Sequence, residues 1–491
     1  MSAPFRVLYY NWVDYLDAEG RGGGVTVYQR NLMAGMADQP NIEPVFLSSG
    51  LSHDLRGGAP RWEPVRHGAR ADRAQRYEIV NSAVLAPAHH AFGDTAQLED
   101  TATEAAFFDF ITKEGPFDVV HFNNLEGVPA RVLALKEQFP QTRVILSLHN
   151  YYPFCPQVNL WRDEQATCID NDGGRACASC LPHNHNHRLL RLADALSYRL
   201  RVAGLEPGRA AYDLTYRWLW RIGGRAARAV RWVKKRLKNT VTQALTQQDN
   251  THFATRRQQM VGLINDHCDA VLCVSDAVRK LAVAHGIQDK KAHTSYIGTL
   301  EAQEFSRTKP RVFPSKARTL TLAYLGYMRR DKGFFFLLDA LEAMPDETLG
   351  QLRLVLASRR GDAATFARVT ALETRLGGLE YHDGYSHDDL DRLLAEVDLG
   401  LIPVLWHDNL PQVAIEMHAR HIPLLCADMG GAQELGNCPD LVFPAGDKSA
   451  FQAKLETLLA HGLDVEAYWQ DAMPPVRMDT HLSDLIQIYQ R

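Results

Sequence analysis

Short apolar runs alternate with amphipathic stretches along most of this chain, and that alternation restricts the fold more than any other feature. Strands separated by helical stretches are typical of parallel sheets with crossover helices. In the first half we predict strands at Arg6–Asn11, Pro44–Leu47, Asp118–Phe122, Arg143–Leu148 and Ala270–Ser275. In the second half we predict them at Leu320–Leu325, Leu352–Ala357, Glu380–His382, Leu399–Val404, Leu424–Ala427 and Leu441–Phe443. The sequence therefore predicts an α/β protein with two doubly wound, Rossmann-like domains.

The composition agrees with an ordinary globular protein. The 491 residues are 46% hydrophobic and 23% charged, and this length suits two or three domains. A net charge of −4 argues against nucleic acid as a partner. We see no secretion signal and no apolar run of about 18 residues. With eight cysteines in addition, we expect a protein of the reducing cytoplasm without a membrane-spanning helix.

The two sets of strands define the expected domains. Residues 1–300 form an N-terminal domain, in which 151–259 interrupts the strand pattern as a helical insertion. Residues 301–475 form a C-terminal domain, and we expect the helix in 476–491 to cross back onto the first. Ligands of doubly wound domains bind at the carboxyl ends of the strands. We therefore expect a binding cleft where the two domains face each other.

Two acidic residues eight positions apart mark the most informative stretch. Asp408 follows a predicted strand, and Glu416 lies about one turn into a predicted helix that starts near Pro411. Free backbone N–H groups at a helix start suit an anionic group, whereas carboxylates more naturally hold hydroxyls. A sugar attached to a nucleoside diphosphate offers both. The alternative is a helix cap with a nearby surface charge.

With His421-Ile422-Pro423 and Gly430-Gly431 behind it, this stretch resembles the signature of the family-4 retaining glycosyltransferases, which have the GT-B fold. Their pattern is E-x7-E, a small-residue helix, G-x-P, a strand and a Gly-Gly turn. Here Asp408 replaces the first glutamate, and His421 stands where glycine is usual. The resemblance covers most of both predicted domains and leaves out roughly residues 182–259.

The resemblance assigns expected roles around the donor. It implies that Glu416 binds the ribose hydroxyls of a nucleoside-diphosphate sugar and that Asp408 faces the donor sugar. Asn409, Leu410 and Pro411 lie where backbone amides of the family meet the phosphate, although Pro411 has no N–H to donate.

A second match runs from Gly326 to Gly333 and ends in the Lys332-Gly333 pair that the family also has. Tyr327 stands where the family usually has arginine. The resemblance implies that Lys332 and a nearby cation stabilise the charge on the leaving diphosphate, so no catalytic metal is expected. Arg329 or Arg330 can reach the same phosphate, and we favour Arg329. The alternative is a solvated loop of cations.

In the first domain, Gly23 and Gly24 belong to a glycine run between the first strand and a helix. Glycine permits close approach of backbone to a ligand, and the resemblance implies that these two lie at the donor. His149 ends the strand Arg143–Leu148, where a histidine of the family contacts the donor sugar. Asn150 replaces the aspartate that often follows. The alternative is a buried histidine bonded to backbone.

Four cysteines open the insertion. Cys155, Cys168, Cys177 and Cys180 include one C-x-x-C pair, a spacing compatible with a tetrahedral structural zinc site. Disulfides and unliganded thiols are the alternatives.

The segment 217–238 has no acidic residue and carries an apolar stripe beside a basic one, with three tryptophans. This pattern predicts an interfacial helix on an anionic membrane. The alternative is a helix packed on the protein with a solvated basic face.

The resemblance implies transfer of a sugar from a nucleoside-diphosphate sugar to an acceptor hydroxyl, with retention at the anomeric carbon. The basic segment favours a glycan or glycolipid acceptor, in assembly of cell-surface polysaccharide at the inner face of the plasma membrane. Two alternatives remain: a phosphorylase-like or hydrolytic enzyme on the same fold, and a degenerate, non-catalytic partner subunit.

Overall fold

The computed structural model describes residues 4–180, 186–222, 251–314 and 318–491. Contacts within the chain divide it into two compact units, and each is described by itself. Unit 1 comprises Met1–Val158, Ile169–Val271 and His285–Lys291. Unit 2 comprises Asn159–Cys168, Leu272–Ala284 and Ala292–Arg491. The predicted boundary near residue 300 remains a prediction.

The first sheet has eight strands within the described residues, in the order β10-β9-β6-β5-β1-β2-β4-β3. Its central strand β1 pairs in parallel with β2 and β5, and β3 pairs antiparallel with β4 at the edge. The strands are β1 (Phe5–Asn11), β2 (Ile42–Ser52), β3 (Arg61–Pro64), β4 (Arg76–Val80), β5 (Val119–Phe122), β6 (Arg143–Leu148), β9 (Ala270–Cys273) and β10 (Ala292–Thr294). Val7, Leu8, Tyr9 and Tyr10 are fully buried, as expected of a strand covered on both faces.

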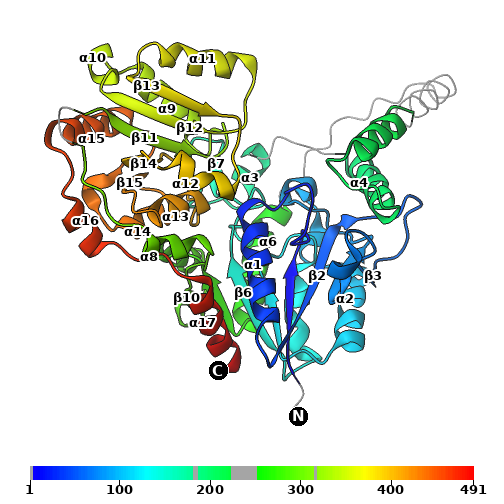
Figure 1. The fold of residues 1–491 in the computed structure, drawn as a ribbon. Helices are drawn as coiled ribbons and strands as arrows, with labels where there is room; N and C mark the ends of the chain where they lie inside the picture. The colour runs from blue at the N-terminus through cyan, green and yellow to red at the C-terminus, as the bar shows by residue number, and fades with distance from the viewer. Residues whose placement is uncertain (1–3, 181–185, 223–250, 315–317) are drawn as a thin grey trace. The chain divides into compact units, whose positions relative to one another are not determined.

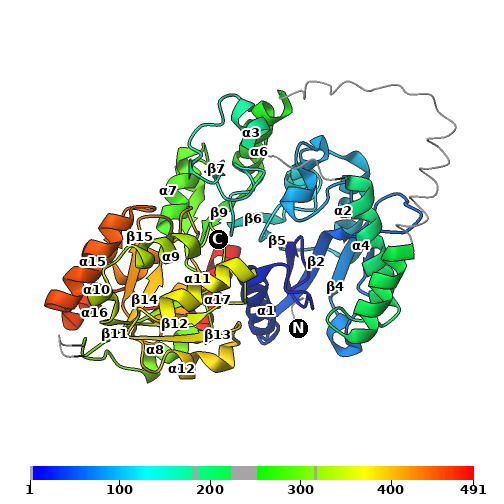
Figure 2. The same cartoon turned by 90° about the horizontal axis from the view of Figure 1, so that it is seen from above.

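Helices cover both faces of this sheet. α1 connects β1 to β2, and α2 lies between β4 and β5, so the two connections run in opposite directions across the sheet. Because such crossovers are right-handed, the two helices lie on opposite faces (Figure 1). The longer helices here are α1 (Gly23–Ala37), α2 (Thr101–Glu114), α4 (His187–Val202), α6 (Thr251–His267) and α7 (Asp276–Ala284), with the short α3 (Arg175–Cys180). α4 packs against β2 (Figure 2).

The second sheet has six strands within the described residues, in the order β13-β12-β11-β14-β15-β16. All five neighbouring pairs are parallel. The strands are β11 (Leu320–Leu325), β12 (Leu352–Ala357), β13 (Gly378–His382), β14 (Leu399–Ile402), β15 (Leu424–Ala427) and β16 (Val442–Phe443). A two-stranded antiparallel ribbon, β7 (Trp161–Arg162) with β8 (Ala166–Thr167), also belongs to unit 2.

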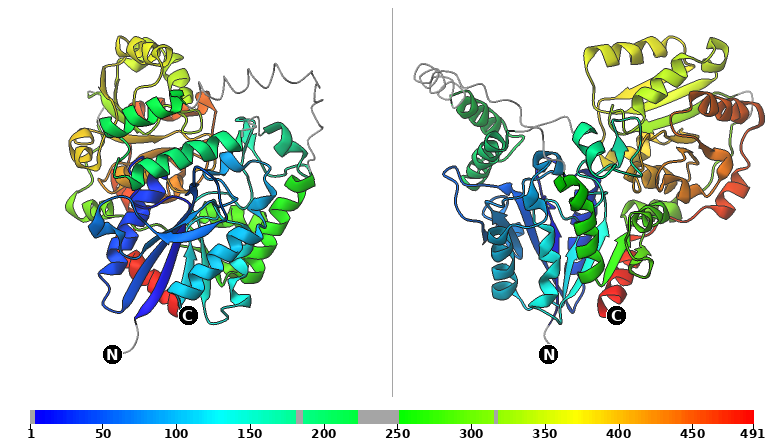
Figure 3. Two further views of the ribbon diagram at one scale, coloured as in Figure 1. Left: turned by 90° about the vertical axis from the view of Figure 1, so that its right-hand side faces the viewer. Right: turned by 180° about the vertical axis from the view of Figure 1, so that it is seen from behind.

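Helices flank the second sheet in the same manner (Figure 3). α9 and α11 follow successive strands toward one edge, and α13 and α14 follow strands toward the other, so the pairs lie on opposite faces. The helices are α8 (Glu304–Arg307), α9 (Phe334–Glu342), α10 (Asp346–Leu349), α11 (Ala363–Glu373), α12 (Leu390–Leu393), α13 (Gln412–His418), α14 (Ala432–Gly436), α15 (Lys448–His461), α16 (Val465–Asp471) and α17 (Met478–Gln490). No helix in the described part of the chain is both long and apolar enough to span a bilayer.

Candidate functional site

The loop that carries Asp408 is held by two glycines from a neighbouring turn. The Gly431 N–H donates to the Asp408 carbonyl at 3.0 Å. A Cβ on Gly430 would lie 1.8 Å from that same carbonyl oxygen, and one on Gly431 would lie 2.4 Å from the Asn409 oxygen. The Ser275 hydroxyl donates to the Asn409 carbonyl at 2.7 Å. Side chains larger than hydrogen do not fit at the two glycines, so the Gly-Gly turn and the Asp408 loop form one packed unit.

Lys332 lies beside this loop. Its Nζ forms an ion pair with Asp408 Oδ2 and lies 5.3 Å from the centre of the Trp406 ring. The next residue, Gly333, has φ +72 and is the N-cap of α9, and a Cβ there would lie 1.6 Å from the Pro403 oxygen. Sterics therefore explain why glycine follows Lys332: only glycine allows the backbone at position 333 to contact the chain at the end of β14.

The other predicted cation in this turn has a different partner. Arg329 Nε lies 2.9 Å from Asp331 Oδ1, with the arginine side chain 64% exposed. Arg330 lies 3.3 Å from Glu164, which belongs to the β7–β8 ribbon. The structure thus brings Lys332, and not Arg329, to the Asp408 carboxylate.

Glu416 is buried and bracketed by two residues of the loop after β13. Its Oε1 lies 3.2 Å from His387 Nε2, and its Oε2 accepts from the Tyr385 hydroxyl at 3.3 Å. The Glu416 carboxylate raises the pKa of His387, and burial raises that of Tyr385. A ligand hydroxyl that bonds Glu416 would compete with His387, a relation that no sequence signal indicated.

The helix that carries Glu416 starts one residue after Pro411, so the proline precedes the first turn and does not belong to it. α13 begins at Gln412 with Pro411 as its N-cap, and no acidic residue occupies its first turn. Asn409, Leu410 and Pro411 are buried. The α13 N-terminus is therefore free of negative side chains in its first turn, as an anion-binding role requires.

His421 stands where the family usually has glycine, and its backbone conformation shows why few other residues fit there. It follows the end of α13 with φ +55, the left-handed conformation that usually selects glycine after a helix. Histidine is among the residues that enter this region more often than most. Here its ring stacks on Phe305 at 4.2 Å, and its Nδ1 lies 2.8 Å from the Thr308 hydroxyl.

In unit 1 the glycine run forms the start of α1. Gly22 is the N-cap, and a Cβ there would lie 1.9 Å from the Thr26 hydroxyl oxygen. Gly23 has φ +54, and Gly24 is exposed. The first turn of α1 has no acidic residue and no side-chain cap, so this end of the helix is chemically suited to an anion.

His149 and Asn150 follow β6 at the carboxyl edge of the first sheet. The His149 ring lies 5.0 Å from that of Tyr28, and its Nε2 lies 3.3 Å from Asn123 Oδ1. Asn150 donates to Glu126 at 2.9 Å and accepts from the Tyr152 N–H at 3.0 Å. Asn150 is thus a structural amide.

Glu126 itself was not predicted. It is 3% exposed, burial raises its pKa, and it accepts hydrogen bonds from Ala88 N, Asn124 and Asn150. The Asn123-Asn124 pair that precedes it, directly after β5, is the local signal that could have drawn attention to it.

Glu434 is a second residue that the sequence analysis missed. Its carboxylate accepts from the backbone N–H groups of Asp276 and Ala277 at 2.9 and 2.7 Å, and from the Tyr296 hydroxyl at 2.7 Å. It therefore caps the N-terminus of α7. No local pattern links position 434 with a helix start so far away in sequence.

The cysteine cluster gives no metal site in the described residues. No group of three or more His, Cys, Asp or Glu side chains has a metal-binding arrangement there. The structural zinc predicted at Cys155, Cys168, Cys177 and Cys180 stays a prediction.

Comparisons with known proteins extend this geometry. Residues 319–461 match the family model of glycosyl transferases group 1, whereas no curated protein matches the chain in sequence. Similar solved structures include HepE of Anabaena in complex with UDP, at 12% identity and a TM-score of 0.53 over 99% of both chains. Sucrose-phosphate synthase from Thermosynechococcus elongatus has 14% identity and a TM-score of 0.53, over 99% of this chain and 98% of that one.

A third similar structure is the lipopolysaccharide outer core galactosyltransferase WaaB, at 10% identity and a TM-score of 0.55 over 99% of both chains. At such identities the likeness concerns the fold alone. The chain has the GT-B glycosyltransferase fold, which confirms the predicted fold class.

Proposed function

We propose that the protein is a retaining glycosyltransferase that moves a sugar from a nucleoside-diphosphate sugar to an acceptor hydroxyl. The observation that carries the proposal is the Lys332–Asp408 ion pair beside the start of α13, with Glu416 in the same helix. The cation and the helix start without a side-chain cap suit a diphosphate. The two buried carboxylates suit the hydroxyls of the sugar and the ribose attached to it. The match of residues 319–461 to group 1 glycosyl transferases supports it.

In this proposal Lys332 moves from Asp408 to the diphosphate as the donor binds. The bond between the anomeric carbon and the phosphate oxygen breaks, and the acceptor oxygen forms a new bond to that carbon on the same face. The departing phosphate oxygen takes the acceptor's proton. Lys332, with Arg329 and the helix starts, stabilises the negative charge that develops there, and no catalytic metal is invoked.

The remaining donor contacts follow from the same reasoning. Glu416 binds the ribose hydroxyls, and Asp408 faces the sugar. The backbone of Asn409-Leu410-Pro411 lies beside the phosphate. In unit 1, His149 and the Gly23-Gly24 backbone are the candidates for contacts with the donor. Residues 1–300 would then form the acceptor domain and 301–475 the donor domain, with 476–491 crossing back.

We further propose a glycan or glycolipid acceptor at an anionic membrane surface, in assembly of surface polysaccharide. The described part of the basic segment exposes Trp218 at 61% and Ile222 at 42%, and Leu214, just before the segment, is 74% accessible. The exposed Arg217 and Arg221 alternate with them. Apolar and basic side chains on one surface suit an interface with anionic lipid. The remainder of the predicted helix, 223–238, lies outside the described residues.

Sedimentation with liposomes tests the membrane proposal. The wild type is expected to bind vesicles that contain phosphatidylglycerol and to stay in solution with pure phosphatidylcholine. The double variant Leu214→Ser, Trp218→Ser is expected to lose most of this binding. The matched control Leu55→Ser changes an exposed leucine outside residues 214–222. Equal binding by all three proteins would remove the membrane proposal.

A non-catalytic partner subunit remains a second candidate, because Asn150 is engaged by Glu126 and Tyr152 and Tyr327 replaces the usual arginine. Proton NMR of the purified protein with donor sugars and mixed glycan acceptors separates the candidates. A new glycosidic anomeric signal of the donor's configuration supports retaining transfer. Free sugar without acceptor dependence indicates a hydrolase, a sugar phosphate formed only with added phosphate indicates a phosphorylase, and nucleotide binding without turnover indicates a subunit.

A further inference from the structure

A polar pocket lies in unit 1 at the carboxyl ends of β1, β2 and β4, and α4 of the insertion closes one side of it. Its walls include Trp12, Asp17, Ser48, His67, Glu78 and Arg201. The free volume inside is about 20 Å³, which is room for one or two water-sized groups. The pocket therefore admits the edge of a ligand and not a whole ring.

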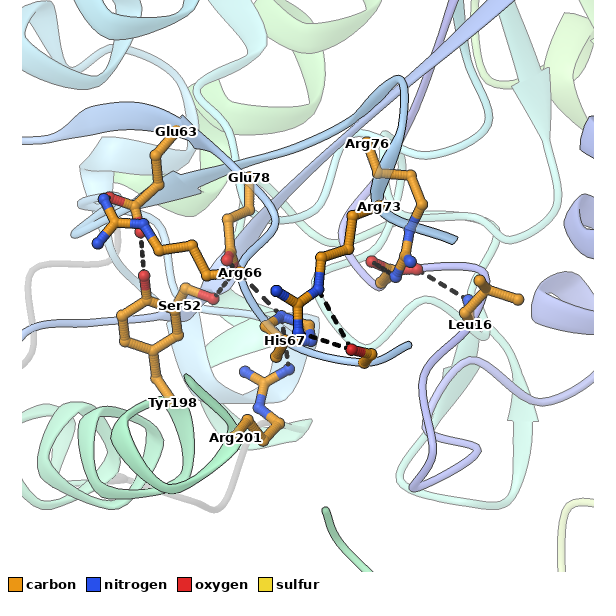
Figure 4. A network of polar contacts seen from close by, with 12 residues as sticks. Leu16, Ser52, Glu63, Arg66, His67, Arg73, Arg76, Glu78, Tyr198 and Arg201 are labelled. Carbon is orange, nitrogen blue, oxygen red and sulfur yellow. Dashed lines mark hydrogen bonds and ion pairs between the residues drawn. The ribbon is translucent and has the colours of Figure 1, made fainter. Parts of the chain in front are cut away.

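The charges around the pocket balance. Asp14 pairs with Arg76 at 2.6 Å, and Asp17 pairs with Arg21. Glu78 and Arg201 are the remaining carboxylate and guanidinium, with His67 between them (Figure 4). Three carboxylates in the lining make it poorly suited to a phosphate. The two guanidinium groups of the lining, with Arg76 paired to Asp14, make it poorly suited to a cation. The charge balance favours a neutral ligand.

One acceptor and one donor in this lining lack hydrogen bonds. Glu78 is 3% exposed; its Oε2 accepts from Ser52, but its Oε1 has no hydrogen-bond partner among the described residues. Arg201 Nε likewise has none in that part of the chain. Buried polar atoms without partners are uncommon in native proteins and call for an explanation.

His67 lies between the two groups and serves only one of them at a time. Its Nε2 lies 3.2 Å from Arg201 Nη1 and 3.6 Å from Glu78 Oε1. A guanidinium only donates, so when Nε2 accepts from Arg201 it carries no proton for Glu78; the tautomer with a proton on Nε2 faces Glu78 and leaves Arg201 without that acceptor. The pocket is left with an acceptor at Glu78 and a donor at Arg201 Nε.

We infer that this pocket binds the hydroxyl-bearing edge of a neutral sugar of the acceptor. A sugar hydroxyl both donates and accepts, so it satisfies Glu78 Oε1 and Arg201 Nε together. Trp12 adds an apolar wall of the kind that packs against the C–H face of a sugar ring. The inference rests on the proposed function. It adds that the inserted helix α4, through Arg201, takes part in acceptor selection.

Ligand-observed NMR titration of the full chain tests the inference. The probes are the methyl glycosides of glucose, galactose, mannose and N-acetylglucosamine, with inorganic phosphate and spermidine as charged comparisons. We expect at least one glycoside to bind, and neither charged probe to compete with it. Arg201→Gln and Arg201→Lys both remove the Nε donor and should weaken glycoside binding about five- to tenfold. The control Arg199→Gln alters an exposed arginine of the same helix.

The outcomes separate the pocket from the proposed function. Glycoside binding that depends on Arg201, without any sugar transfer, would support the inferred sugar-binding pocket and contradict the proposed transferase activity. Transfer with an acceptor KM that is the same in the wild type and in both Arg201 variants would overturn the pocket alone. Absence of glycoside binding to the wild type, or displacement of the glycoside by phosphate, would also overturn it. Melting temperatures of all variants show whether each is folded.

Discussion

Lys332 and Asp408 form an ion pair although 76 positions separate them in the sequence. Lys332 comes from the turn between β11 and α9, and Asp408 from the loop between β14 and α13. β11 and β14 are neighbours in the second sheet, so the two turns meet at the same carboxyl edge. The pair is the centre of the proposed donor site, and its coupling is measurable.

A double-mutant cycle on nucleoside-diphosphate affinity tests that coupling. Lys332→Met should weaken binding about tenfold, because it removes a charge from the diphosphate. Asp408→Asn should have little effect in the wild type but should restore part of the affinity in Lys332→Met, where the carboxylate no longer has a compensating cation. Lys309→Met, an exposed lysine outside the turn, is the control. Strictly additive effects would show that the pair does not act as a unit.

Gly333 should be intolerant of a side chain for a steric reason. Gly333→Ala places a Cβ 1.6 Å from the Pro403 oxygen, whereas Gly446→Ala, at a similar positive φ, meets nothing within 4 Å. Both variants carry the left-handed backbone cost of about 1–2 kcal/mol. Thermal unfolding should therefore show a clearly larger loss for Gly333→Ala. Equal melting temperatures would mean that the contact with Pro403 is not maintained.

His387 should make stability depend on pH. The Glu416 carboxylate raises the pKa of His387 in the folded protein above its usual 6.5. The pair therefore stabilises fully below the unfolded pKa, and this contribution is lost as pH rises through the folded value. The melting temperature of wild type relative to His387→Gln should be higher at pH 6 than at pH 9. The same difference at both values would argue against the pair.

Asp194 should change the pH dependence of stability with a sign opposite to that of an ordinary ion-paired aspartate. Burial raises its pKa to about 7, against the lowering effects of Arg21 and Arg201. The folded state then binds more protons than the unfolded state between about pH 4 and 7, so stability falls as pH rises through this range. Asp194→Asn should flatten that part of the melting-temperature profile. Identical profiles in the two proteins would contradict a buried neutral carboxyl.

The sequence predicted the central strands well and the edges poorly. β6, β11, β12 and β15 match the predicted bounds, since buried parallel strands are short continuous apolar runs. β3 and β4 were missed because charged residues interrupt Arg61–Pro64 and Arg76–Val80. No run of apolar residues marks these two strands, of which β3 is the edge of the sheet and β4 its neighbour.

The parts of the candidate site that lie within one short segment of sequence were predictable. Lys332-Gly333 and the Asp408–Glu416 stretch each follow a strand and are close in space because their strands are neighbours. Contacts between distant segments were not predictable, such as the bracket of His387 around Glu416 or the bond from Arg201 to His67, 134 positions away. Only the packed fold brings these side chains together.

The most direct test of the central claim is a thermal-shift titration with UDP, GDP, ADP and CMP and their sugar conjugates. A ligand that binds only the folded state raises the melting temperature by mass action. We predict that one nucleoside diphosphate raises it in the wild type, less in Lys332→Met and least in Glu416→Ala. No shift with any nucleotide at several millimolar, or an equal shift in all three proteins, would contradict the proposed donor site.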